Sequence, residues 1–539
     1  MNKKRTLLAV SAAVAASMLL ASCGGEEKVS KTADMNLDSY PIKTDAELTY
    51  WVALDTNVTA TCANLGETPF AKEMEKRTGV KVKYIHPAIG QEAEAFSLMV
   101  ASDELADIVE YNWVTALGGP TSSIKDKVII PLTDKMEQYA PNLTAHLKAD
   151  SALDAMVKTD EGDYYVFPFV RNYLEYPDTV VGLGGSCTNG PVIRRDWLDD
   201  LGLEEPTTPQ ELEVVLREFK DKKGATAPLT ALKYETYKLM ALFSATNDFY
   251  LDGDTVKYGV FDEEYKTGLS ELARWFKEGL LDKNYISADQ TMVDSNMLNG
   301  NSGVTYASGG SGIGKWLDTM KDKDPKFNVT ALRYMAKEKG GKPRFVLAAS
   351  AYSGYGSAAI TTQCEYPELA MKYLDYGYSK EGQMLYNFGV EGETYEMVDG
   401  KPKFTDYVHN NPDGLSQTQA MSRYMRAYVW GPFLHDNLNS TEYYQKEQQK
   451  DAAKKWTYGI EEAAKRKVPA ALIMSAEENE EYAQIMTEVE KYRDEMTASI
   501  ISGILPVDKY DEMIQRIKEL KIDRAIEIKQ AAYNRYLNR

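Results

Sequence analysis

Three stretches, ELTYWVAL (47–54), VKVKYIHP (80–87) and ADIVEYNW (106–113), decide the fold class. Each has the composition of a β-strand, and the second alternates apolar residues with lysine. Helices are predicted between these strands. Thr68 is the expected N-cap of the first helix, which ends near Gly79, and GQEAEAFSLMVASDEL (90–105) is predicted to form the second. The order strand, helix, strand, helix, strand predicts a parallel sheet with right-handed crossovers.

The same order of elements starts again further along the chain. PVIRRDWLDDLG (191–202) leads into PTTPQELEVVLREFKDKKG (206–224), where Thr208 and Glu211 form a predicted capping box. Asp-Gly pairs predict hairpins at 248–259 and 395–405. A third unit runs from FVLAAS into GSAAITT (345–362), and from Ser475 onward the chain is mostly helical by pattern. Two α/β units predict two lobes around a cleft, with ligands bound beyond the carboxyl ends of strands.

The first 45 residues differ from the rest. Basic residues Lys3 to Arg5 and the apolar run Leu7–Ala21 precede Leu-Ala-Ser-Cys23, which resembles a bacterial lipoprotein signal. Cleavage would leave Cys23 linked to diacylglycerol, and two acyl chains are enough to hold a protein on the outer face of the membrane. The alternative is an ordinary signal peptide with a coincidental cysteine. Residues 23–45 are polar and are predicted to form a flexible tether.

The composition and net charge argue against several classes of partner and site. The formal net charge is −19 over 539 residues, so phosphate backbones are repelled and nucleic acid is not an expected partner. Cys62, Cys187 and Cys364 have no metal spacing, and we interpret them as small buried residues. His86, His146, His409 and His435 stand far apart, and no hydrolase or metalloprotease motif occurs.

A glycine-rich loop at 305–316 has the spacing of a nucleotide-binding motif. In TYASGGSGIGKW (305–316), Gly309, Gly314 and Lys315 match the spacing of a phosphate-binding loop. Trp316 occupies the position where Ser or Thr would bind magnesium, so we reject a nucleotide site. A strand, a glycine turn and a helix start are predicted instead. Either Tyr306, Ser308 and Gly309 face the cleft, or the loop is a plain connection.

Several phrases identify a resemblance. NLGETPFAKEMEKRTGVKV, LADIVEYNW, RRDWLDDLGL, YNFGVEGETYEMVDGK and the C-terminal AAYNRY are similar to the family 1 extracellular solute-binding proteins of ABC importers, in their large lipoprotein branch of Gram-positive gut bacteria. The likeness covers nearly the whole chain. It implies a two-lobed α/β fold of the type II periplasmic-binding-protein kind, with a hinge, a central cleft and a helical C-terminal region.

The resemblance also implies a function and partners. These are capture of a sugar, most simply an oligosaccharide, outside the cell, delivery to ABC permease subunits, no catalysis, no cofactor and a monomeric state. Relatives often carry a calcium loop where this chain has KDKKGATAP (220–228), which offers too few oxygens, so no metal is expected. Capture of a peptide or other small solute, an adhesion or sensory role, and a surface carbohydrate-active enzyme remain alternatives.

By analogy with that fold, crossovers between lobes are expected near 166–190, 350–358 and 400–410. The expected parts of the chain are a signal peptide (1–22), the tether (23–45), lobe 1 (46–168 and 356–405), lobe 2 (169–355 and 406–500) and a C-terminal helical segment (501–539).

Sugar sites combine aromatic faces with polar side chains and backbone donors. The family placement and the strand ends nominate these residues: Trp51, Asn57, Asn112, Trp113, Arg171, Tyr306, Ser308, Gly309, Tyr355 and Trp430. Trp51 is equally compatible with a core position. Tyr355 and Ser357 suit a hinge or a ligand contact, and Trp430 suits a contact between lobes or a sugar platform. Trp197 is interpreted as a core residue.

Overall fold

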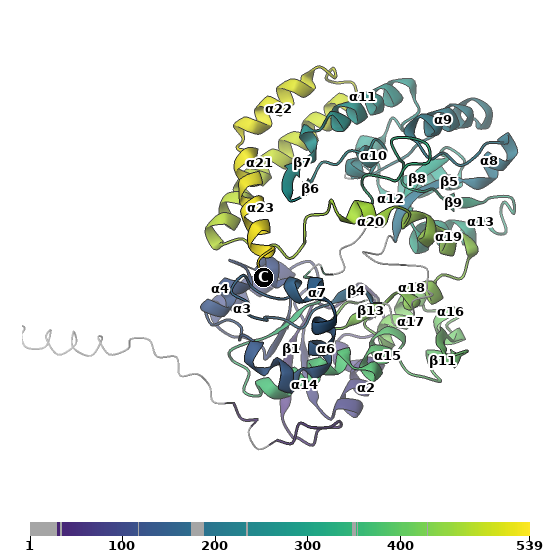
Figure 1. Cartoon of the computed structure of the whole chain (residues 1–539). Helices are drawn as coiled ribbons and strands as arrows, with labels where there is room; N and C mark the ends of the chain where they lie inside the picture. The colour runs from purple at the N-terminus through teal and green to yellow at the C-terminus, as the bar shows by residue number, and fades with distance from the viewer. Residues whose placement is uncertain are drawn as a thin grey trace, which may run out of the picture.

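The protein has two lobes, one above the other in Figure 1, with an α/β solute-binding protein fold. The computed structural model describes residues 30–32, 35–116, 118–173, 188–232, 235–347, 352, 354–427 and 429–539. Two large hydrophobic cores, one in each lobe, account for most of the buried side chains.

Lobe 1 is built on a four-stranded sheet in the order β10 (Ala358–Ile360), β3 (Ile108–Glu110), β1 (Glu47–Trp51), β2 (Lys81–Ile85). β1 is parallel to both β2 and β3, as predicted, whereas β10 is antiparallel to β3. The linking helices are α2 (Pro69–Thr78) and α3 (Glu92–Ser102). The predicted cap of α2 is confirmed, because the Thr68 hydroxyl accepts a hydrogen bond from the backbone N–H of Ala71.

Lobe 2 departs from the prediction of a repeated parallel unit. In its sheet, β5 (Asn189–Arg194) lies between β8 (Val304–Ser308) and β9 (Val329–Ala331), and both pairings are antiparallel. β5 leads into α8 (Arg195–Leu201) and α9 (Pro209–Lys223) as expected. The chain then runs through further helices before β8, and a connection of that length does not fix the direction of the returning strand.

Most local predictions in and around lobe 2 are confirmed. Thr208 caps α9 by accepting from the N–H of Glu211, but the Glu211 carboxylate accepts from Thr207 and not from the N–H of Thr208, so the predicted capping box forms only in part. The hairpins are β6 (Phe249–Asp252) with β7 (Thr255–Tyr258), and β11 (Tyr395–Val398) with β12 (Lys401–Phe404). The glycine loop consists of the end of β8, a short π-helix over Gly309–Gly314 where a turn was predicted, and the start of α13 (Lys315–Met320).

The remaining elements complete the two lobes. Those packed with lobe 1 are α1 (Thr56–Thr59), α4 (Gly119–Lys125), α5 (Met136–Tyr139), α6 (Pro141–Ala149), α7 (Ser151–Met156), β4 (Val170–Tyr173), α14 (Pro367–Asp375), α15 (Lys380–Phe388), α16 (Asp406–His409), α17 (Gln417–Tyr424), β13 (Leu434–Asp436) and α18 (Asn437–Tyr443). Those of lobe 2 are α10 (Thr236–Ala241), α11 (Glu263–Glu278), α12 (Gln290–Leu298), α19 (Glu447–Trp456), α20 (Ile460–Ala464), α21 (Ala476–Ile501), α22 (Lys509–Glu519) and α23 (Ile522–Tyr536).

The segment 406–436 lies with lobe 1, whereas the sequence analysis placed it in lobe 2. Phe433 and Leu434 belong to the core of lobe 1, and β13 pairs in parallel with β4. These contacts join segments more than 260 residues apart, which a reading of local patterns does not connect. The chain therefore crosses to lobe 2 between α18 and α19 rather than near 400–410.

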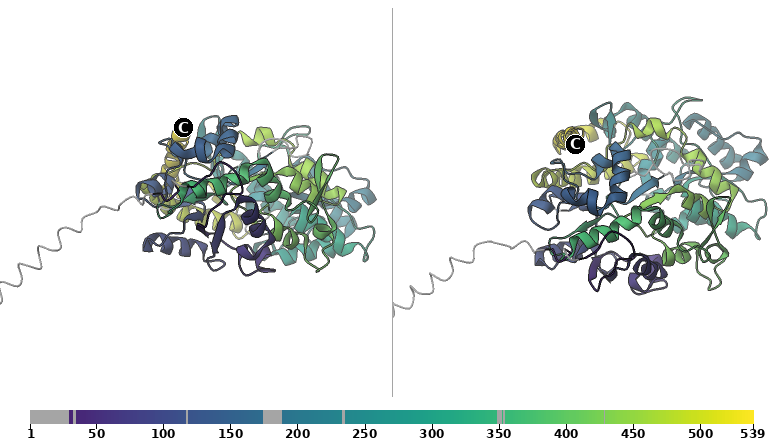
Figure 2. Two further views of the ribbon diagram at one scale, coloured as in Figure 1. Left: turned by 90° about the horizontal axis from the view of Figure 1, so that it is seen from below. Right: turned by 60° about the horizontal axis from the view of Figure 1, so that its bottom comes forward.

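The C-terminal helices belong to lobe 2 and end against lobe 1. α22 and α23 contribute Met513, Ile517 and Ala525 to the core of lobe 2 rather than forming a separate unit. The C-terminus lies beside the blue helices of lobe 1 in Figures 1 and 2, and near it Arg535 and Arg539 form ion pairs with Asp160 of lobe 1 at 2.9 and 2.8 Å.

The predicted tether is packed over its described part. Leu37 and Ile42 are buried in the core of lobe 1, and Ser30 and Thr32 donate hydrogen bonds to the buried carboxylate of Glu368. The tether has too few apolar side chains for its sequence pattern to indicate packing, yet Leu37 and Ile42 both pack into lobe 1. Cys23, like all of residues 1–29, lies outside the described residues.

Two further observations concern membrane and thiol chemistry. Within the described residues, none of the helices has the length and apolar character required to cross a membrane. Cys62 and Cys364 are free thiols, the second of them buried, while Cys187 lies outside the described residues.

Candidate functional site

A cavity of about 540 Å³ opens where two parallel strands of lobe 1 end. β1 ends at Trp51 and β3 at Glu110, and the segments that follow each strand form much of its wall. The lining residues are Trp51, Ala53, Leu54, Asp55, Thr56, Ile89, Glu92, Ala93, Glu110, Tyr111, Asn112, Thr115, Tyr355, Gly356, Val429 and Trp430. Ligands of parallel α/β sheets bind at this edge, so the position is the expected one.

Aromatic rings form one side of this cavity. Tyr111 stacks on Phe96 with ring centroids 3.8 Å apart, and Trp51 packs against both rings. Tyr355 is 59% exposed and meets Trp430 edge to face at 5.8 Å. A sugar presents apolar C–H faces, and Tyr355 is the most exposed of these rings for stacking on such a face.

Asn112 supplies a polar group at the same place. Its side-chain oxygen is buried and has no hydrogen-bond partner among the described residues. A Cβ on Gly354, whose φ is +83°, would stand 2.1 Å from that oxygen. Glycine is therefore required beside Asn112, whose buried amide oxygen is an unused hydrogen-bond acceptor beside the cavity.

A buried ion pair holds the loop that carries Trp430. Arg426 donates to both carboxylate oxygens of Glu110 at 2.9 and 3.0 Å, and its Nε donates to the carbonyl oxygen of Trp430. Tyr50 donates to Glu110 as well, at 2.8 Å. Burial raises the pKa of Glu110, and Arg426 and Tyr50 oppose that rise. Trp430 itself has a φ of +60°, a strained conformation that these contacts maintain.

A second, smaller cavity of about 190 Å³ shares Trp430 with the first. It lies beside β4, β13 and α18, where the chain passes between lobes, and it is lined by Phe169, Arg171, Thr188, Ala427, Trp430, His435 and Ser440. The guanidinium carbon of Arg171 lies 4.3 Å from the ring centroid of Trp430. The two cavities therefore meet at one aromatic side chain.

The predicted site residues fall into groups. Trp51, Asn112, Tyr355 and Trp430 line the larger cavity, and Arg171 lines the smaller one. Trp51 is nevertheless only 5% exposed and belongs to the core of lobe 1, as its strand position also allowed. Asn57 lines neither, because its amide donates to Asp55, the cap of α1. Trp113 is a core residue, 1% exposed, whose indole N–H donates to the carbonyl oxygen of Val109.

The lobe 2 loop lines neither of these cavities. Tyr306 is buried in the core of lobe 2, and Ser308 exchanges a hydrogen bond with Ser311. Gly309 donates its N–H to the carbonyl oxygen of Thr188 at 3.1 Å, which places this end of the loop beside the smaller cavity. Trp316, at the start of the helix after the loop, is fully buried and its indole N–H donates to Asp294.

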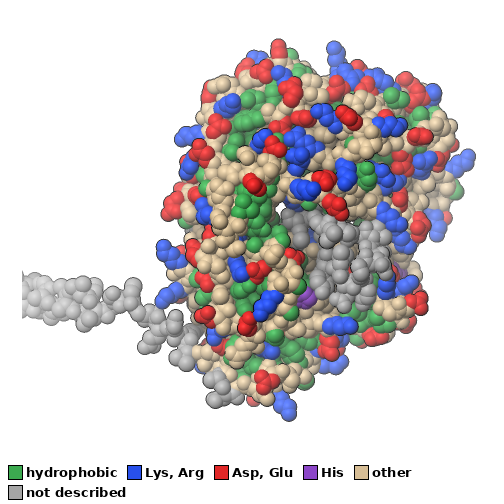
Figure 3. Space-filling view, in the orientation of Figure 1, with side chains coloured by type: hydrophobic (Ala, Val, Ile, Leu, Met, Phe, Trp, Pro, Cys, Tyr) green, Lys and Arg blue, Asp and Glu red, His purple; other side chains and the backbone are tan. Residues whose placement is uncertain are grey.

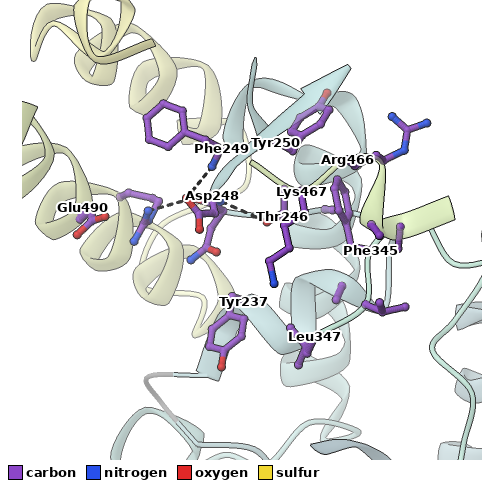
Figure 4. A pocket seen from close by; sticks show the side chains of 17 residues that line it. Tyr237, Thr246, Asp248, Phe249, Tyr250, Phe345, Leu347, Arg466, Lys467 and Glu490 are labelled. Carbon is purple, nitrogen blue, oxygen red and sulfur yellow. Dashed lines mark hydrogen bonds between the residues drawn. The ribbon is translucent and has the colours of Figure 1, made fainter. Parts of the chain in front are cut away.

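A third cavity, of about 430 Å³, lies within lobe 2 (Figure 4). Tyr237, Tyr250, Phe345 and charged side chains from α21 and the segment after α20 surround it. Its most buried charge is already satisfied, since Arg493 donates to Tyr258 and forms an ion pair with Asp494. The cavities at Trp430 hold unsatisfied polar atoms instead, so we take them as the candidate site.

Several lining residues were not predicted from the sequence, among them Asp55, Thr56 and Tyr111. They follow the strands that were predicted, and the rule of strand ends could have nominated them. His435 reaches the smaller cavity only through the pairing of β13 with β4. No group of three or more His, Cys, Asp or Glu residues suited to a metal ion occurs in the part of the chain that the structure describes.

Comparison with known proteins places the chain among binding proteins. The sequence profile of the bacterial extracellular solute-binding protein family matches residues 66–384. Lipoprotein LipO of Bacillus subtilis is 24% identical over 66% of this chain and 70% of its own length. The fructooligosaccharide ABC transporter substrate-binding protein FusA of Streptococcus pneumoniae is 27% identical over 53% of this chain and 54% of its own.

A solved structure shows the same fold across nearly the whole molecule. The HMO-binding, ABC-transporter-associated solute-binding protein of Bifidobacterium longum infantis superposes with a TM-score of 0.73. The superposition covers 91% of this chain and 99% of that one at 17% identity.

Proposed function

Because the chain belongs to the bacterial extracellular solute-binding protein family, which is non-catalytic, we propose that it is the receptor of an ABC importer for a carbohydrate, most simply an oligosaccharide. The observation that carries the proposal is the aromatic cavity at the strand ends of lobe 1, with Trp51, Tyr355 and Trp430 around the amide of Asn112. Relatives whose names refer to fructooligosaccharide and HMO binding support the choice of a sugar.

Binding would be completed by closure of the two lobes. Apolar side chains gather at the waist between the lobes in Figure 3. We propose that lobe 2 supplies its wall through Ser308 and Gly309 once the lobes approach, whereas Tyr306 stays in the core of lobe 2. The free energy for closure comes only from contacts that are stronger in the closed state. The closed, monomeric receptor would then present both lobes to the permease subunits.

We also propose that Cys23 carries a lipid that anchors the receptor to the extracellular face of the cell membrane. The family is extracellular, and the LipO relative is a lipoprotein. Residues Ser30 and Thr32 are already attached to lobe 1, so only residues 24–29 separate the packed chain from the anchor. Mass spectrometry of the membrane fraction checks this: the Cys23→Ser variant should appear unlipidated and in the medium.

A thermal-shift screen with a panel of oligosaccharides and peptides, followed by titration of tryptophan fluorescence, tests the function. We expect at least one oligosaccharide to raise the melting temperature, and Tyr355→Ala to weaken its binding. Tyr237→Ala is the matched control, because Tyr237 is also exposed but lines the cavity within lobe 2. A shift with peptides and with none of the sugars would replace the proposal by peptide capture.

A separate substitution tests whether the lobe 2 loop around Ser308 contributes to the binding site. Ser308→Trp would place a large ring at the proposed wall, so we expect weaker binding of the oligosaccharide found in the screen. Unchanged affinity would remove this loop from the site while leaving the lobe 1 cavity in place.

A further inference from the structure

Arg171 is a half-buried cation without a carboxylate partner among the described residues. It projects from β4 into the smaller cavity, where none of the lining residues is acidic. Its guanidinium lies over Trp430 at 4.3 Å and near Phe169 at 5.7 Å. Partial burial lowers the pKa of Arg171, but an arginine stays charged at any physiological pH.

Several other buried or half-buried arginines of the described chain pair with a carboxylate, whereas Arg423 donates to the hydroxyl of Tyr407 instead. Arg426 pairs with Glu110 and Arg344 pairs with Asp262, each at 2.9 Å. Arg194 stacks over Trp197 much as Arg171 stacks over Trp430, yet it also pairs with Asp196 at 2.6 Å. At the buried Arg194, stacking on an aromatic ring therefore accompanies a carboxylate and does not replace it. A desolvated cation without one costs free energy unless a ligand supplies the negative charge.

His435 adds a second unsatisfied group to the same cavity. It is the β13 residue directly opposite Arg171 in the pairing with β4, and its Nδ1 atom is buried with no hydrogen-bond partner among the described residues. Burial, together with the positive charge of Arg171, lowers the pKa of His435 to about 3, so the ring is neutral at pH 7. A neutral imidazole offers one N–H donor without adding a charge.

From this geometry we propose that the smaller cavity binds a carboxylate of the sugar ligand, so that the receptor takes an acidic, uronate-containing oligosaccharide. The proposal rests on the carbohydrate function proposed above. The planar guanidinium of Arg171 suits a carboxylate through two parallel hydrogen bonds, with His435 and Ser440 beside it. Trp430 is common to both cavities, so the acidic unit would lie at Arg171 while neighbouring units extend across the rings of the larger cavity.

The test is calorimetric titration of the purified full chain in detergent with a galacturonic acid trimer, its methyl ester, a sulfated galactose trimer and a neutral galactose trimer. Arg171→Gln should weaken binding of the acid trimer about 10- to 100-fold, the range for a hydrogen bond to a charged group. Arg171→Lys should recover part of that loss, because the charge remains without the planar fork. Affinity of Arg171→Gln for the ester, and its melting temperature, show whether the variant is folded.

Arg333→Gln is the matched control. Arg333 also lies over an aromatic ring, Tyr458 at 4.1 Å, and it too has no ion pair among the described residues, but it is exposed in lobe 2. We expect this variant to bind the acid trimer as the unmodified protein does.

The possible results distinguish carboxylate binding at Arg171 from carbohydrate binding as such. Preference for the acid trimer that Arg171→Gln removes supports the inference, and preference for the sulfated trimer keeps an anion at Arg171 but rejects a carboxylate. Equal affinity for acid, ester and neutral trimers, unchanged in Arg171→Gln, overturns the inference and leaves a sugar receptor. Binding of none of the sugars here and in the wider panel overturns both.

Discussion

The ion pair between Arg426 and Glu110 gives the sharpest stability prediction, through the variant Arg426→Met. The two side chains are only 3% and 7% exposed, so the substitution leaves the Glu110 carboxylate buried with Tyr50 as its one remaining donor among the contacts described above. Removal of one partner from a buried pair costs about 3–5 kcal/mol. At roughly 2–4 °C per kcal/mol for a lobe of this size, the melting transition of lobe 1 should fall by about 6–20 °C.

Scanning calorimetry at pH 7 measures this, with the two lobes allowed separate transitions because a two-domain chain need not unfold in one step. Arg333→Met is the control, since Arg333 is exposed and has no ion pair among the described residues. The double variant Glu110→Leu/Arg426→Met should be milder than Arg426→Met, because it removes the uncompensated charge.

The effect should also depend on pH. With Arg426 gone, the folded-state pKa of Glu110 rises further above its unfolded value, so the stability contribution of its protonated form is lost as pH rises. Arg426→Met should therefore be less destabilised at pH 5 than at pH 8. A fall of less than about 2 °C at pH 7, or a double variant as unstable as the single one, would refute the assigned role of this pair.

Three further predictions concern other buried groups. Burial would raise the pKa of Glu368, but hydrogen bonds from Lys135, Ser30 and Thr32 lower it to about 2. Its contribution to the free energy of unfolding is therefore present above pH 4.5 and lost as pH falls toward 2. Glu368→Gln should remove that pH dependence from the urea concentration at the unfolding midpoint. If the midpoint of the variant changed with pH as it does in the unmodified protein, Glu368 would not be the group responsible. Burial raises the pKa of Asp375 to about 6, although Asn142 and Leu143 donate hydrogen bonds to its carboxylate. Its contribution to the free energy of unfolding is therefore present below pH 3.8 and lost as pH rises through about 6. Asp375→Asn should flatten the urea midpoint between pH 4 and 7, and an unaltered profile would count against this. Gly190→Ala should destabilise lobe 2 by about 1–3 kcal/mol, because the new Cβ would stand 2.2 Å from the Trp456 ring; calorimetry showing an unchanged lobe 2 transition would disprove it.

The sequence by itself determined the local elements and the class of protein. The caps at Thr68 and Thr208 and both Asp-Gly hairpins depend on contacts within a few residues, so their patterns are visible in the chain. The parallel strands of lobe 1 followed from their alternation with helices, and the family phrases indicated a non-catalytic binding protein. Trp51, Asn112, Tyr355 and Trp430 were nominated and do line one cavity.

Only the tertiary structure decided which segments meet. The antiparallel sheet of lobe 2, the place of β13 beside β4 and the packing of residues 35–45 on lobe 1 all join distant segments, for which local patterns carry no signal. Trp113 follows a strand end just as Asn112 does, and only packing turns its ring into the core. Arg171 and His435 share a cavity for the same reason: strand pairing across more than 260 residues brings them together.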